Sequence, residues 1–151
     1  EGHGFEPGVD RLTHADAMRV PMQVRHEMRE ADRGPMGYVA DGAIATIVDR
    51  FFSDPMHSVQ GWETAADAQR RIVKSVDQAL HDYPDQDVLF VGHGTVGALL
   101  YCHWAGHAIS GEHRQSDDGG NLFSFFTPGR RLDLGWTALE DATRKAGDSS
   151  A

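Results

Sequence analysis

The sequence has a single cysteine, no long apolar run and comparatively few basic residues. One cysteine, Cys102, among 151 residues excludes an intrachain disulfide framework and a zinc site built from several cysteines. No apolar stretch approaches the roughly 18 to 20 residues that a membrane-spanning helix needs. The 23 acidic residues outnumber the 14 basic ones, for a net charge of −9, so the chain has no general attraction for nucleic acids or anionic membranes. We therefore expect a partner that is neither a nucleic acid nor a membrane.

Two familiar sequence signals are also missing. No glycine-rich loop of the Walker or Rossmann type occurs, so we expect neither ATP nor NAD, and no other cofactor. No signal peptide is visible, and we expect a cytoplasmic location.

What remains is the composition of one globular domain. The apolar fraction of 40% and the charged fraction of 25% are typical of soluble chains, and the length suits a single domain over residues 1–151. Glycine and polar residues predict an irregular arm over residues 1–15. The polar composition of residues 141–151 predicts a frayed tail.

Hydrophobic periodicity predicts three helices. Residues 43–52 carry a one-sided apolar stripe. The clearest pattern covers residues 64–82, where Thr64 can cap the free amides and Asp67 follows in a box-like position. Residues 95–106 form a third, strongly apolar segment.

The predicted strands lie around these helices. Asp87–Val91 is a continuous apolar run, typical of a strand buried on both faces of a parallel sheet. Residues 20–24 predict a short strand in which Pro21 must lie at the start or at an edge. Residues 121–127 and 131–134 predict two late strands that can pair. A helix, a buried strand, a glycine turn and a second helix in succession predict an α/β sandwich.

The turn after the buried strand carries the most informative pattern, Gly92-His93-Gly94. The strand delivers His93 to the carboxyl edge of a sheet, where open α/β folds bind ligands. The glycines let backbone approach a ligand closely, and the amino terminus of the next helix favours an anion. The alternative is a histidine that only caps a structural turn.

Several ordered motifs together resemble the histidine phosphatase superfamily, the phosphoglycerate-mutase-like proteins. The resemblance runs from about Arg19 to about Trp136 and is carried by Gly61-Trp62-Glu63-Thr64 with Ala68 and Arg70, by Val88–Gly94, by Gly119-Gly120-Asn121 with Phe123, and by His26–Arg33. It implies a three-layer α/β sandwich with a mainly parallel sheet. Residues 87–92 would be a central strand, covered by the helices at 64–82 and 95–106.

The resemblance also implies phosphoryl transfer through a phosphohistidine, without a metal. In that family one histidine attacks phosphorus, a second histidine and two arginines hold the phosphoryl oxygens, and a carboxylic acid protonates the leaving oxygen. By motif His93 matches the second histidine. Glu30 matches the acid, because Met28-x-Glu30 is followed by Gly34. Glu27 is the competing choice for the acid.

The expected phosphate-binding residues follow from the same match. They are His93, Gly94 and Thr95 at the start of the predicted helix, and Asn121 in the Gly-Gly-Asn motif. We expect the ligand to be a phosphorylated small molecule or a phosphoprotein.

The chain departs from the family pattern in one respect. The nucleophile normally lies in an Arg-His-Gly motif after a first apolar strand, and neither is present here. Gly2-His3-Gly4 has no apolar strand before it and no adjacent arginine. We favour the hypothesis that the chain is part of a longer enzyme that supplies this strand. The alternative is a non-catalytic module that binds a phosphorylated ligand or a protein. A missing first strand would leave an open sheet edge, which a homodimer can cover.

Other polar residues have ordinary interpretations. His103 and His107 are spaced for a metal site, with His113 or Asp117 as a third ligand. No His-Glu-x-x-His motif supports such a site, and we expect none. Arg70 and Arg71 predict a solvated helix face, from which one side chain can reach a phosphate. Cys102 is expected to be a small core residue.

Overall fold

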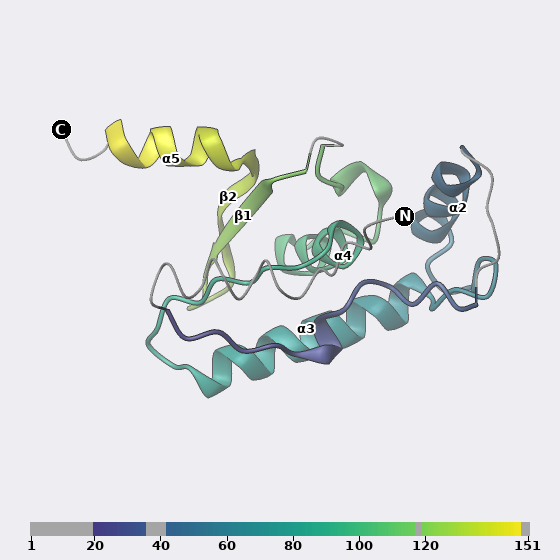
Figure 1. Cartoon of the computed structure of the whole chain (residues 1–151), viewed down its shortest axis with the longest axis horizontal. Coiled ribbons are helices and arrows are strands. Elements are labelled where there is room, and N and C mark those ends of the chain that lie inside the picture. Colours follow the sequence, from purple (N-terminus) through teal and green to yellow (C-terminus); the bar gives the residue numbers. More distant parts are fainter. Residues whose placement is uncertain (1–19, 36–41, 117–118, 149–151) are drawn as a thin grey trace, which may run out of the picture.

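A computed structural model describes residues 20–35, 42–116 and 119–148. Its elements follow the chain as η1 (His26–Met28), α2 (Ala43–Ser53), α3 (Ala65–Asp82), α4 (Gly94–Ala105), η2 (Gly111–His113), β1 (Asn121–Phe126), β2 (Arg131–Ala138) and α5 (Leu139–Asp148) (Figure 1). The three helices predicted from periodicity are therefore confirmed as α2, α3 and α4.

Helix α3 begins as its sequence predicts. The Asp67 amide donates to Thr64 Oγ1 at 3.1 Å, and the Thr64 hydroxyl donates to the Asp67 carboxylate at 2.8 Å. This reciprocal cap satisfies amide groups that the first turn leaves free. One face of the helix, which includes Ala68, Ile72 and Val76, is buried against the rest of the molecule.

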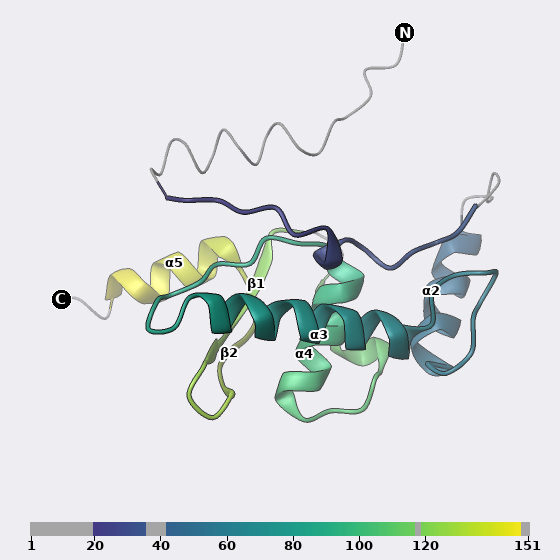
Figure 2. The ribbon, with the colours of Figure 1, turned by 90° about the horizontal axis from the view of Figure 1, so that it is seen from below.

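Helix α4 packs against α3 and is buried over much of its length (Figure 2). Val96, Ala98 and Leu99 are almost completely excluded from solvent. The Gln69 side chain of α3 also donates to the Leu99 carbonyl oxygen at 2.9 Å. Gly106 ends α4 with a φ of 76°, a left-handed conformation that glycine adopts at little cost.

The core consists of two neighbouring apolar clusters. In the first, Phe51 and Phe52 of α2 meet Trp62 and the α4 residues Ala98 and Leu99. The two phenylalanine rings pack edge to face, with centroids 5.3 Å apart. The second cluster lies between α3 and α4 and contains Ile72, Val76, Val96 and Leu100. Both clusters are built mainly from helices.

The sheet of the described residues has two antiparallel strands. Asn121 pairs with Ala138, and Phe126 pairs with Arg131, with irregular register around Ser124. The predicted pairing of two late strands is thereby confirmed, and β2 extends further than its sequence suggested. Aromatic side chains attach the hairpin to α4, because Phe123 and Trp136 pack against Tyr101.

The prediction of a central strand at residues 87–92 is wrong for this structure. The segment is extended, but it belongs to no β-ladder in the part of the chain described here. Phe90 packs against the core between α3 and α4, whereas Leu89 is 79% exposed and Val91 is 66% exposed. The described residues form a mixed helix and strand structure with a small antiparallel sheet, and a three-layer sandwich with a mainly parallel sheet is not found among them. The physical reason is that a strand needs neighbouring backbone to satisfy its hydrogen bonds.

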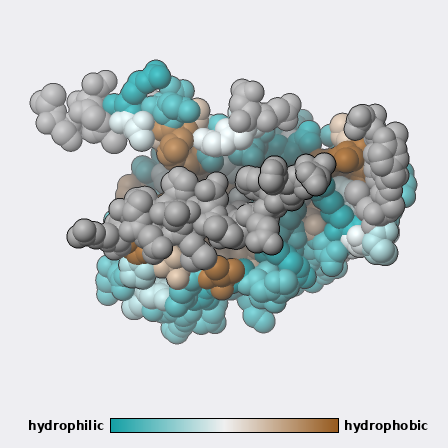
Figure 3. Space-filling view, viewed as in Figure 1, coloured by the Kyte–Doolittle hydropathy of each residue, from teal (hydrophilic) through white to brown (hydrophobic). Residues whose placement is uncertain are grey.

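Residues 20–25 form a second extended segment outside any ladder in the described ranges. Val20, Met22 and Val24 are exposed, Val24 by 85%. Both extended segments run lengthwise along α3 (Figure 2). Apolar atoms reach the surface in several separate patches on the face shown in Figure 3.

Helix α5 follows β2 directly, and it covers much of the region for which a frayed tail was expected. Glu140 and Asp141 lie in its first turn, where negative charge favours a helix. Across the described ranges, no helix combines the length and apolar character needed to cross a membrane. The predicted arm at 1–15 lies outside the described residues.

Candidate functional site

His93 stands at the point where the extended segment 87–92 meets α4. It is the N-cap residue of the helix, with φ of −107° and ψ of 157°, and its side chain makes no capping hydrogen bond. His93 therefore caps the helix through its backbone, whose carbonyl oxygen accepts from the Gly97 amide at 3.0 Å, and not through its imidazole. The residue is exposed, so its imidazole is accessible to a ligand.

Glu30 reaches the same end of α4 from a distant part of the sequence. The amides of Thr95 and Val96 donate to its two carboxylate oxygens, at 3.2 Å and 3.1 Å. The Ala31 amide donates to the same carboxylate at 2.9 Å. The carboxylate thus occupies the electropositive amino terminus of the helix, two residues after His93.

Glu27, the competing candidate for the acid, lies elsewhere. Its side chain is 64% exposed and approaches Arg29 at 3.6 Å from the short helix η1. The fold therefore brings Glu30, rather than Glu27, beside His93. That Glu30 acts as an acid and His93 holds phosphate remain predictions.

Gly94 and Thr95 form the first turn of α4, and a residue that the sequence analysis did not identify lies against them. A Cβ atom on Gly94 would stand 2.7 Å from the side-chain nitrogen Nε2 of Gln115. The glycine therefore makes room for this amide. Gln115 is 21 residues further along the chain and belongs to no motif, so no sequence pattern indicates that it lies here.

Asn121, the remaining predicted phosphate-binding residue, is occupied in a local turn. Its side-chain amide donates to Ser116 Oγ at 3.1 Å and to the Gly119 carbonyl oxygen at 2.9 Å. In the described part of the chain, no hydrogen bond connects it to His93 or Glu30. The structure thus brings together Glu30, His93, Gly94 and Thr95, and it shows Asn121 shaping the entry to β1.

The Glu30 segment is supported from α3 by an ion pair. The Arg71 guanidinium donates to both Glu63 carboxylate oxygens, at 2.9 Å and 2.7 Å. The side chains of Arg71 and Glu63 are only 11% and 16% exposed. The prediction that Arg71 lies on a solvated face is wrong, whereas Arg70 is 70% exposed and pairs with Asp67 as such a face would. The sequence shows only an arginine in a polar helix, and it contains no signal of this contact.

The ion pair with Arg71 changes the pKa of Glu63. Its hydrogen bonds from Arg71 hold the pKa of the Glu63 carboxyl below its ordinary value, although partial burial acts in the opposite direction. The backbone amide of Asp32 also donates to this carboxylate, at 3.1 Å, and adds to the lowering. Both groups of the pair therefore stay charged around neutral pH.

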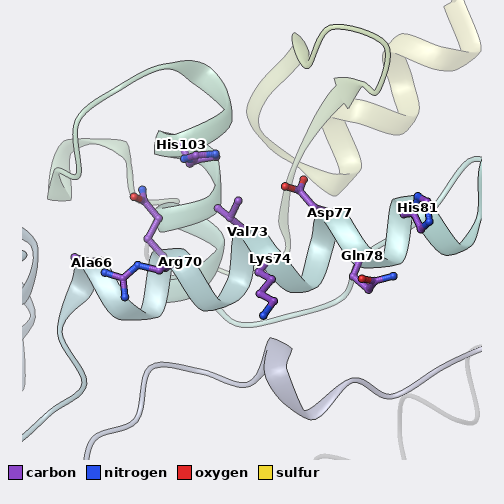
Figure 4. Close-up of a pocket in the computed structure, with 9 residues that line it drawn as sticks. Ala66, Arg70, Val73, Lys74, Asp77, Gln78, His81 and His103 are labelled. Carbon is purple, nitrogen blue, oxygen red and sulfur yellow. The ribbon is translucent and has the colours of Figure 1, made fainter.

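The histidines that suggested a metal site lie apart from this arrangement. The rings of His107 and His113 stack with centroids 4.1 Å apart. His103 instead faces a groove of about 640 Å³ along α3 (Figure 4). Among the described residues, no three histidine, cysteine or carboxylate side chains are grouped to hold a metal ion. Asp117 lies outside those residues.

Two cavities of the molecule lie away from the His93 end of α4. The groove on α3 is bordered by Arg70, Lys74 and Asp77, and a second hollow of about 400 Å³ lies between α2 and η2. Neither includes His93 or Glu30. Cys102 is fully buried, as predicted, and burial raises the pKa of its thiol.

The chemistry available at the start of α4 is anion binding and proton transfer. A histidine and the carboxyl group of Glu30 lie there beside helix amides, two of which donate to that carboxyl group. His3, the histidine of Gly2-His3-Gly4, lies outside the described residues.

Comparison with known proteins gives a family match over the part of the chain that contains these residues. A family model described as the histidine phosphatase superfamily (branch 1) matches residues 12–120, a range that contains Glu30, α3 and His93. Asn121 lies one residue beyond the matched range. No curated protein sequence matches the chain significantly. Because the family match covers well over half of its length, the chain belongs to the histidine phosphatase superfamily.

Proposed function

We propose that this chain is the main part of a metal-independent phosphomonoesterase that works through a phosphohistidine. The observation that carries the proposal is the convergence of Glu30 and His93 at the amino terminus of α4, from positions 63 residues apart. Family membership supports phosphoryl-transfer chemistry in general. The substrate class is a phosphorylated small molecule or a phosphoprotein.

Each residue has a role in the proposed reaction. A histidine nitrogen attacks phosphorus and the bond from phosphorus to the leaving oxygen breaks, while Glu30 gives its proton to that oxygen. His93 and the amides of Gly94 and Thr95 stabilise the phosphoryl oxygens. Water then attacks phosphorus, the bond between phosphorus and the histidine nitrogen breaks, and the proton that water loses returns to Glu30. Because the Glu30 carboxylate already occupies the Thr95 amide, it must move aside when a phosphoryl group binds.

The attacking histidine is proposed to come from an upstream strand that ends in Arg-His-Gly. Exposed Leu89 and Val91 support this, since the extended segment 87–92 belongs to no ladder among the described residues and carries these apolar side chains on its outer face. A strand added there would satisfy the backbone and cover both side chains. In that assembly the family's three-layer sandwich with a parallel sheet would form. A homodimer is the alternative way to cover this edge.

A test compares the chain with a longer version that carries an upstream strand and an Arg-His-Gly turn. We expect the chain by itself to show almost no turnover of p-nitrophenyl phosphate at about pH 6, and the longer version to be active. In the longer version, His93→Ala should lower kcat by about 10² to 10³, the loss expected for one group that stabilises the transition state. His57→Ala is the matched control, because His57 is 78% exposed and its one ion pair with a described residue is that with Asp54.

Three outcomes separate the hypotheses. A burst of product with a trapped phosphohistidine in the chain by itself would contradict the upstream nucleophile. Unchanged kcat in His93→Ala would contradict the role of His93. Vanadate binding that His93→Ala removes, with no turnover even in the longer version, would support the alternative of a non-catalytic module that binds a phosphorylated ligand or protein.

A further inference from the structure

Arg71 directs its guanidinium at the backbone of the Glu30 segment. Its Nη1 donates to the carbonyl oxygens of Glu27, at 2.7 Å, and of Arg29, at 3.0 Å. Its Nη2 donates to the carbonyl oxygen of Glu30 at 3.3 Å and to the Glu63 carboxylate, which Nε also contacts. All five guanidinium N–H groups are thereby used, three of them on backbone carbonyl oxygens within residues 27–30.

Glu63 attaches the other side of the same loop. Its carboxylate accepts from the Asp32 amide at 3.1 Å, and its own amide donates to the Asp32 carbonyl oxygen at 2.8 Å. The Arg71–Glu63 pair therefore binds backbone groups both before and after Glu30. A loop held at both sides keeps its backbone in place, so the Glu30 side chain can leave the helix terminus only by rotating about its own bonds.

Glu30 contacts α3 through its backbone and α4 through its side chain. Its carbonyl oxygen accepts from Arg71 of α3, and its carboxylate accepts from the Thr95 and Val96 amides of α4. The position of the carboxylate next to His93 thus depends on where Arg71 holds the backbone.

We propose that Arg71, oriented by Glu63, is a positioning residue that fixes the Glu30 carboxylate against the amino terminus of α4. The proposal deepens the proposed function, on which it rests for the role of Glu30 as the proton donor. A lysine cannot replace Arg71 in this role, because an ammonium group has three donors and lacks the planar fork that serves a carboxylate and several carbonyl oxygens together.

The test reads the position of the carboxylate directly and needs no turnover. In the ¹⁵N-labelled native chain, the amide resonances of Thr95 and Val96 should shift together across an acid pH titration, because both amides donate to one carboxylate. Glu30→Gln should abolish this shared titration and so identify its source. Arg71→Lys should also abolish it, while the resonances of the later turns of α4 stay in place.

Arg70→Lys provides the matched control. Arg70 is the preceding residue of α3, but its side chain is 70% exposed and, within the described ranges, it pairs with Asp67 alone. The Arg70→Lys variant should leave the shared titration of Thr95 and Val96 unchanged. An effect of Arg70→Lys equal to that of Arg71→Lys would overturn the proposal, because any loss of helix charge would then suffice.

A shared titration that persists unchanged in Arg71→Lys would also overturn the proposal. If Arg71→Lys does not fold, Glu63→Gln is examined in the same way, since it keeps the shape of the side chain and removes the charge that orients Arg71. Loss of the shared titration there supports the proposal and its persistence overturns it. If the longer enzyme is inactive and Arg71→Lys loses the shared titration, the proposed function is rejected and the positioning role stands. If the longer enzyme is active and Arg71→Lys keeps the shared titration, the positioning role is rejected and the proposed function stands.

Discussion

The helical core and the two extended segments have similar apolar side chains and opposite exposure. Leu99 in α4 is fully buried, whereas Leu89, ten residues earlier, is 79% exposed. Val76 in α3 is likewise buried, and Val24 in the first extended segment is 85% exposed. A helix satisfies its backbone within itself and then needs only one neighbour for its apolar face. An extended segment needs backbone partners beside it and packing on both faces, so it stays open where they are lacking.

The comparison is tested most strongly by two leucine truncations. Leu99→Ala should destabilise the chain by about 2 to 5 kcal/mol, because it opens a cavity in the cluster that Leu99 forms with Phe51, Phe52 and Trp62. Leu89→Ala should change the free energy of unfolding by no more than about 0.5 kcal/mol, as expected for an exposed side chain. Urea denaturation of both variants measures the difference. Equal losses would mean that residues 87–92 are covered in solution and that the contrast between the two regions is not real.

A smaller difference is expected between the ion pairs of the two regions. The lowered pKa of Glu63 means that its contribution to stability is present above the ordinary carboxyl pKa and is lost as the pH falls through the lower, folded-state pKa. Glu63→Gln should therefore cost about 1 to 3 kcal/mol at neutral pH, and this penalty should shrink in acid.

Asp82→Asn is the variant to compare with Glu63→Gln, because it removes an ion pair with the extended segment 20–25. Its partner Arg25 is the last residue of the extended segment 20–25, and hydrogen bonds from Arg25 and Gln78 lower the pKa of Asp82. Solvent screens this exposed pair, so its loss should have a smaller effect than that of Glu63. Denaturant unfolding over a pH series compares them. A Glu63→Gln penalty that is independent of pH would show that the charge of Glu63 does not stabilise the fold.

The smallest expected effect concerns the two glycines around His93. A Cβ on Gly94 would meet the Gln115 amide, which can swing aside, whereas a Cβ on Gly92 meets nothing within 4 Å. Gly94→Ala should shift the side-chain amide resonances of Gln115 with a stability change of less than about 1 kcal/mol. Gly92→Ala should leave those resonances in place and can stabilise the chain by up to about 1 kcal/mol through the unfolded state. A Gln115 shift in both variants would contradict the contact with Gly94.

The sequence by itself determined the features that depend on neighbouring residues. The periodicity of α2, α3 and α4 and the cap formed by Thr64 and Asp67 are local, and the structure has them where the sequence predicts them. Motif spacing also selected Glu30 and His93, and the match over residues 12–120 agrees with the family from which that spacing was taken.

Only the tertiary structure decided the contacts between distant residues. Arg71 lies 41 residues from Glu30, and Gln115 lies 21 residues from Gly94, so no local pattern indicates that they meet. For the segment 87–92, the local pattern predicts a structure that the described residues do not form. Its apolar pattern suits a buried strand, but a strand forms only where other backbone lies beside it, and that depends on the rest of the assembled chain rather than on the segment's own residues.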